Sequence, residues 1–160
     1  MDKILKSLVP NLKTFVKDEF DFLRNFPKTI PSKTKVVCFD VTSLYTSIPT
    51  DLGIKALHYW LEKLSHLVDK RFTINFVTNS VKFILENNYF QFDSMIWHQL
   101  CGTVIGKSFA LPYACLTMGF LEDTILIPDI LPRNYDPEIC KIIIDFLMRY
   151  IDDDIIVLPD

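Results

Sequence analysis

The sequence predicts a globular α+β protein in which helices pack on one face of a largely antiparallel sheet. Apolar residues recur at steps of three and four in several stretches, which predicts amphipathic helices. Short runs rich in β-branched and aromatic residues, bounded by turn residues, predict strands. The resulting order is helix, strand, helix, helix, hairpin, helix, strand, strand, a mixture typical of α+β folds. Nearly half of the 160 residues are apolar and only four are glycine, so disordered and collagen-like classes are excluded and one domain is expected.

The N-terminal segment is predicted to be helical and basic. Apolar residues from Leu5 to Leu23 follow helical spacing, and Pro10 interrupts them. Residues 1–35 carry eight Lys/Arg and four Asp/Glu (+4), whereas residues 36–160 carry nine and sixteen (−7), which gives the total of −3. We therefore divide the chain into residues 1–35 and a main body of residues 36–160. The lysines fit either a solvated helix face or contact with phosphate.

Each later element rests on a local pattern. An apolar strand ends at Asp40, and a loop from Thr42 to Pro49 follows it. Two helices come next, the first capped by Thr50 or Asp51 and the second, over residues 72–85, starting near Thr73 or Asn75. Residues 89–92 and 95–98 flank Asp93 and Ser94 and predict a β-hairpin. A glycine-bearing turn over residues 102–107 leads into a helix over residues 108–127, and Pro128, Pro132 and Pro137 predict a surface linker.

The final segment predicts a hairpin with carboxylates at its tip. Asp152, Asp153 and Asp154 stand between apolar, strand-forming flanks. Crowded carboxylates repel one another, and a divalent cation relieves that repulsion. Asp40 is a second acidic residue at the end of a strand, so the sequence suggests a shared metal centre.

Other residue types argue against competing classes. Cys38, Cys101, Cys115 and Cys140 show no C-x-x-C spacing, so we expect reduced core thiols rather than a zinc site or a disulfide framework. His58, His66 and His98 form no spaced ligand set and are interpreted as surface or core residues. No stretch reaches the length of an apolar membrane span, and no N-terminal leader is evident. We expect an intracellular protein, nuclear or cytoplasmic, with no membrane partner.

Three blocks of this sequence resemble reverse transcriptases, and among them the Penelope-like retroelement group. The first runs from Phe39 to Pro49 and is similar to the group's D-V-T-S-L-Y-T-N-I-P. The second extends from Gly102 through Pro112 and Tyr113 to Glu122, and the third, residues 150–153, matches the Y-x-D-D box. The resemblance implies a polymerase palm fold over residues 36–158 and RNA-directed DNA polymerase activity. Its partners would be an RNA template, a DNA primer and deoxynucleoside triphosphates.

The resemblance also implies residue roles. Asp40, Asp152 and Asp153 would be the catalytic, metal-binding carboxylates for two Mg²⁺ ions, with Mn²⁺ able to substitute. Tyr45 would obstruct a ribose 2′-hydroxyl, and Gly106 would let the backbone approach the template or the nucleotide. Lys107 would either contact a phosphate or remain a solvated charge. By contrast, Tyr113 is expected in the core, and Asp154, which the box does not require, is expected in solvent.

The sequence departs from the family pattern at three places. Ser47 stands for the usual Asn, Ile105 for Met, and Leu111 for the proline of an Ala-Pro pair, which is expected to displace the turn into the next helix. Counterparts of the later palm lysine, the primer-gripping hairpin, the thumb and most of the fingers are expected to be missing, so a partner chain would supply them. Two alternatives stay open: an inactive remnant that binds nucleic acid or protein, and a metal nuclease, for which no His or Glu is spaced as a general base.

Overall fold

The computed structural model describes residues 1–30, 32–103 and 106–159, which form a mixed α+β structure with antiparallel sheets, as predicted. The chain divides into two compact units, one of Met1–Pro10 with Ser43–Met118 and one of Asn11–Thr42 with Gly119–Asp160. Neither unit coincides with residues 1–35 or 36–160, and that division stays a prediction. None of the helices in the described part of the chain is both long and apolar enough to cross a membrane.

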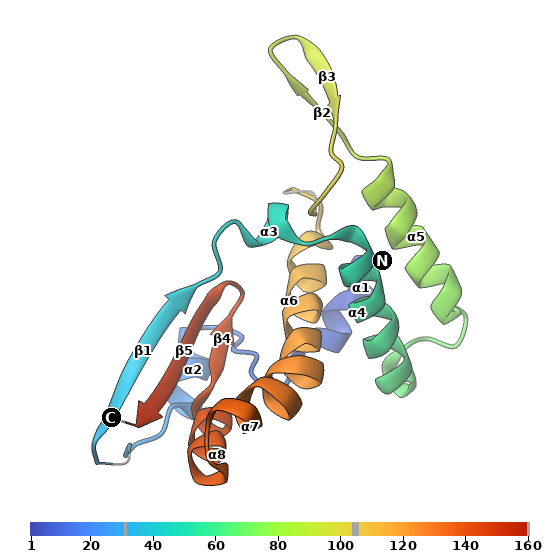
Figure 1. Cartoon of the computed structure of the whole chain (residues 1–160). Coiled ribbons are helices and arrows are strands. Elements are labelled where there is room, and N and C mark those ends of the chain that lie inside the picture. The colour runs from blue at the N-terminus through green and yellow to red at the C-terminus, as the bar shows by residue number, and fades with distance from the viewer. Residues whose placement is uncertain (31, 104–105, 160) are drawn as a thin grey trace. The chain divides into compact units, whose positions relative to one another are not determined.

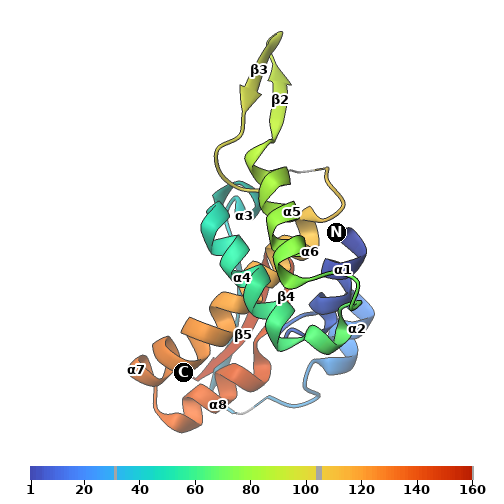
Figure 2. The ribbon, with the colours of Figure 1, turned by 90° about the vertical axis from the view of Figure 1, so that its right-hand side faces the viewer.

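The first unit is mostly helical (Figure 2). Its elements are α1 (Asp2–Leu8), most of the 3₁₀ turn η1 (Val9–Asn11), then α3 (Leu44–Ser47), α4 (Thr50–Lys63), η2 (Ser65–Leu67), α5 (Ile74–Glu86), β2 (Tyr89–Phe92), β3 (Met95–His98) and most of α6 (Ala110–Leu121). The core forms where the apolar faces of α4 and α5 meet, as their helical spacing predicted. The indole N–H of Trp60 donates to the Leu116 carbonyl at 2.9 Å, which joins α4 to α6.

The helix starts in this unit were predicted correctly in one case and wrongly in two. The Thr73 hydroxyl accepts from the Phe76 N–H and caps α5, as predicted. For α4 the prediction was wrong, because the helix follows Pro49 directly and neither Thr50 nor Asp51 caps it with a side chain. The stretch predicted as a loop after Asp40 also contains the short helix α3.

The hairpin β2–β3 forms as predicted. Tyr89 pairs with His98 and Phe92 with Met95. Asp93 and Ser94 form the turn with φ of 50° and 61°, the two positive values that a type I′ turn requires. All eight strand residues are exposed, with Phe92 at 68% and Ile96 at 78%.

The second unit is a small sheet with helices (Figure 1). Its elements are α2 (Glu19–Asn25), β1 (Thr34–Asp40), the π-helical segment η3 (Glu122–Ile130), α7 (Leu131–Asn134), α8 (Pro137–Phe146), β4 (Met148–Tyr150) and β5 (Asp153–Pro159). The strands are antiparallel in the order β1-β5-β4. Residues 14–16 pair with the outer edge of β4, since Arg149 N–H donates to Thr14 O and Val16 N–H donates to Arg149 O.

One sheet face is covered by helices. Ile156 and Leu158 of β5 pack against Leu131 of α7 and against Cys140 and Ile143 of α8. This packing agrees with the prediction of helices on one face. On the opposite face, α2 borders a hollow that is described below.

Two sequence-based expectations about this unit are corrected. The prolines do not mark a surface linker: Pro128 lies within η3, and Pro132 and Pro137 lie in the first turns of α7 and α8, where a missing N–H costs no helical bond. The second concerns the thiols. All four are free, but only Cys115 and Cys140 are buried, and the other two are exposed.

Gly53 tests the packing of α4 on α6. A Cβ at Gly53 would lie 1.8 Å from the Tyr113 hydroxyl oxygen, and the Tyr113 ring is buried, as predicted, with 1% of its surface exposed. We expect Gly53→Ala to lower the free energy of unfolding by about 1–3 kcal/mol through overpacking. Thermal unfolding measures this loss. In a Tyr113→Leu background the same change should cost much less, and an equal cost in both backgrounds would contradict the assigned contact.

Candidate functional site

The predicted acidic hairpin is present and turns through two residues. Tyr150 pairs with Asp153, and Ile151 and Asp152 form the turn. Ile151 has φ 63°, a left-handed conformation that costs a β-branched residue energy and that glycine usually occupies in hairpin turns. Such strain persists only where surrounding contacts impose it.

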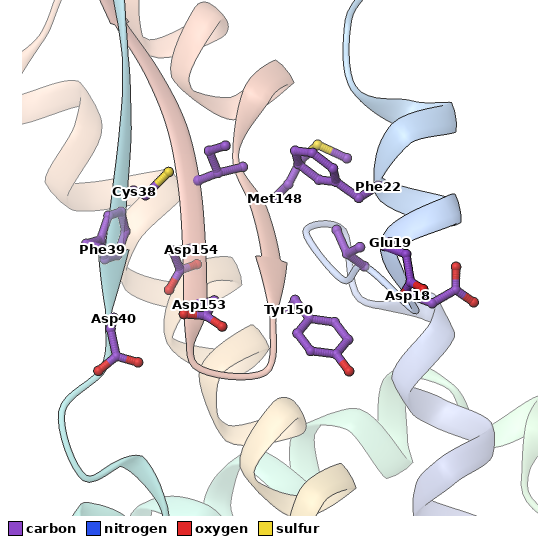
Figure 3. A pocket seen from close by; sticks show the side chains of 12 residues that line it. Asp18, Glu19, Phe22, Cys38, Phe39, Asp40, Met148, Tyr150, Asp153 and Asp154 are labelled. Atoms are coloured by element: carbon purple, nitrogen blue, oxygen red, sulfur yellow. The ribbon is translucent and has the colours of Figure 1, made fainter.

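The register of β1 on β5 brings two predicted metal ligands face to face. Asp40 pairs directly with Asp153, and both side chains are exposed. The pairing continues into the turn, where Val41 N–H donates to the Asp152 carbonyl at 2.9 Å. Like charges at directly opposed positions destabilise a sheet, so this pair favours a bound cation. Figure 3 shows the two carboxylates on neighbouring strands.

The third predicted ligand, Asp152, lies half-buried in the turn. Among the residues that the structure describes, no three His, Cys, Asp or Glu side chains form a metal-binding group. The fold therefore brings Asp40 and Asp153 together but does not gather all three carboxylates. This donor set fits Mg²⁺, which prefers oxygen ligands and is commonly held by one or two carboxylates together with substrate phosphates.

Asp154 is not solvated as expected, because it is buried with 5% of its surface exposed. Successive side chains of a strand alternate between faces, so Asp154 points to the face opposite Asp153. Burial raises its pKa to about 7, against the opposing effect of Arg149, while Glu122, Asp153 and Asp152 add to the rise.

Arg149 and Glu122 were assigned no role from the sequence. Both are buried, and Arg149 Nε donates to Glu122 Oε1 at 2.6 Å. The signal that could have found them is a single charge inside an otherwise apolar element. Arg149 stands between Met148 and Tyr150, and Glu122 follows the apolar helix α6.

A hollow of about 620 Å³ opens beside the paired carboxylates (Figure 3). Phe22, Met148 and Ile155 contribute to its largely apolar lining. Asp40 and Asp153 also line it, so the carboxylates border a space with room for a ligand.

The predicted nucleotide-binding residues belong to the first unit. Tyr45 is half-buried in α3, and its carbonyl accepts from Thr103 N–H at 2.6 Å. Gly102, at φ 83°, contacts the same carbonyl so closely that a Cβ would lie 2.5 Å from it. The glycine-bearing turn thus packs on the backbone of Tyr45.

Gly106 and Lys107 are both exposed. Gly106 has φ 101°, and a Cβ there would meet nothing within 4 Å, so its backbone conformation accounts for the glycine. Val104 and Ile105 lie outside the described residues, and with them the departure from the family pattern at Ile105. The departure at Leu111 lies in the first turn of α6, which begins at Ala110, and its effect on the preceding turn stays a prediction.

Comparison of the sequence with models of known protein families finds no match, and comparison with curated proteins finds none either.

The opposed carboxylates predict stabilisation by divalent cations. Mn²⁺ at about 100 times its dissociation constant should stabilise the protein by about 2.7 kcal/mol, raising its melting temperature relative to EDTA. Asp40→Asn should abolish this response without lowering the melting temperature in EDTA, because the repulsion is removed. Asp145→Asn, an exposed change on α8, serves as the control. A cation response that survives in Asp40→Asn would contradict the assignment.

The raised pKa of Asp154 predicts a loss of stability with rising pH. The folded state favours the protonated carboxyl, so this contribution is complete below the usual pKa of 3.8 and is lost as pH rises to about 7 and above. Unfolding midpoints in EDTA should therefore fall between pH 4 and 8 more steeply for the wild type than for Asp154→Asn. Parallel profiles would contradict the burial of this group.

Proposed function

We propose that this chain is the palm of an RNA-directed DNA polymerase from a Penelope-like retroelement, adding deoxynucleotides to a primer 3′ end with two Mg²⁺ ions. The observation that carries the proposal is the β1–β5 register, which opposes Asp40 from the first motif to Asp153 from the third. These motifs lie more than a hundred residues apart in the sequence. A fold that joins them supports a shared role for their carboxylates.

Each of the predicted site residues would have a separate role in nucleotide addition. Asp40, Asp152 and Asp153 would hold the ions, which on binding would activate the primer hydroxyl and stabilise the departing pyrophosphate. Mn²⁺ would substitute for Mg²⁺. Tyr45 would exclude a ribose 2′-hydroxyl, and Gly106 and Lys107 would contact the nucleotide or the template strand.

The proposal includes partners and location. The template would be RNA, the primer DNA and the substrates deoxynucleoside triphosphates. A partner chain would contribute fingers or a thumb, and the protein would act inside the cell, in the nucleus or the cytoplasm.

A second function is favoured by one observation. The hairpin β2–β3 exposes its apolar side chains, and an isolated two-stranded hairpin is only marginally stable in water. An inactive remnant that uses this hairpin to bind a protein partner would explain that exposure. Its apolar strands contain no Lys or Arg, which disfavours contact with nucleic acid through the hairpin.

Primer extension on an RNA template distinguishes these functions. We expect the purified chain to extend a DNA primer with Mg²⁺ or Mn²⁺, and Asp40→Asn and Asp152→Asn to reduce the rate by on the order of 100-fold or more. Asp145→Asn should extend normally, and Tyr45→Ala should accept ribonucleotides more readily. A folded, monodisperse wild-type sample without extension would favour the remnant, and equal extension by Asp152→Asn would contradict the site.

A further inference from the structure

The ion pair of Arg149 and Glu122 is buried, and both oxygens of Glu122 accept hydrogen bonds. The Arg149 side chain has no exposed surface and that of Glu122 has 7%. One oxygen of Glu122 accepts from Arg149 Nε and the other from the Thr14 hydroxyl. A buried pair of charges contributes little to stability unless all its polar atoms form hydrogen bonds. Two apolar side chains of similar volume often make the folded protein equally stable. The presence of a charged pair here therefore calls for another role.

The same guanidinium reaches the acidic turn. Arg149 Nη1 donates to the Ile151 carbonyl at 3.2 Å. On the other side of the turn, Val41 N–H donates to the Asp152 carbonyl at 2.9 Å. Both carbonyls of the two-residue turn are thus held by hydrogen bonds, one from Arg149 and one from the residue that follows Asp40.

Arg149 is itself fixed by its neighbours. Its backbone pairs with residues 14–16 through two hydrogen bonds of 2.7 and 2.8 Å, and Glu122 anchors its side chain. The contacts therefore run from Thr14 and Glu122 through Arg149 to Ile151. They hold Ile151 at φ 63°, a conformation that its branched side chain disfavours.

We propose that Arg149 is a positioning residue that, anchored by Glu122, fixes the turn and so holds Asp153, at the end of that turn, opposite Asp40 for the cation that these two carboxylates would share. The cation part rests on the proposed function, whereas the fixing of the turn does not. Lysine cannot replace arginine in this role, because its single ammonium lacks the planar fork that contacts Glu122 and the Ile151 carbonyl together.

The deciding variant is Arg149→Met combined with Glu122→Leu. It replaces the charged pair by apolar side chains, which should preserve folding, and removes the donor to the Ile151 carbonyl. Arg149→Lys is the second variant, because it keeps a positive charge beside Glu122. Ile143→Val, a buried change in α8 of the same unit, controls for a general loss of stability.

Two readouts separate positioning from simple structural support. Hydrogen exchange of the Val41 amide reports how well the turn is ordered when no cation is present. Electron paramagnetic resonance measures the Mn²⁺ affinity of the carboxylates. We expect both Arg149 variants to exchange the Val41 amide at least tenfold faster and to bind Mn²⁺ about 10–100-fold more weakly, with Ile143→Val unchanged in both.

Wild-type exchange and Mn²⁺ affinity in either folded Arg149 variant would overturn the proposal. If the wild-type chain binds no Mn²⁺, the metal site of the proposed function fails, and the Val41 exchange rate alone then decides whether Arg149 fixes the turn.

Discussion

The pairing of β1 with β5 in one register is the constraint on which the candidate site depends. Side chains alternate along a strand, so a slip of one residue would move Asp40 to the face that carries Asp154 and Ile156. The helix-covered core fixes which face of the sheet each β5 side chain takes, since Ile156 and Leu158 pack against α7 and α8. An apolar contact on one sheet face thus turns Asp153 to the other face, where the pairing of β1 with β5 places Asp40 beside it.

Much of this unit could be predicted because its signals are local. Strand-forming residues around an acidic turn predicted the final hairpin, and the apolar run before Asp40 predicted β1. In the first unit, Asp93 and Ser94 between aromatic runs predicted the hairpin β2–β3. The meeting of the first and third motifs was suggested by two acidic sites at strand ends and by the family resemblance, but the register that pairs Asp40 with Asp153 has no local signal in the sequence.

The failures have a common physical origin in tertiary packing. The burial of Asp154 depends on which sheet face the helices cover, and the ion pair joins residues 27 positions apart. Prolines were interpreted as a linker because they interrupt a helix, yet at the start of a helix they are tolerated. Cys38 was expected in the core, but it is exposed because β1 is an edge strand of the described sheet. None of these outcomes follows from residue type alone.

A double-mutant cycle on Asp40 and Asp153 tests the central claim most directly. The free energy of unfolding would be measured for the wild type, Asp40→Asn, Asp153→Asn and the double variant, once in EDTA and once with saturating Mn²⁺. The opposed carboxylates predict a repulsive coupling energy in EDTA that becomes favourable when the cation is bound. A coupling energy near zero under both conditions would contradict the claim that the β1–β5 register builds a cation-binding pair.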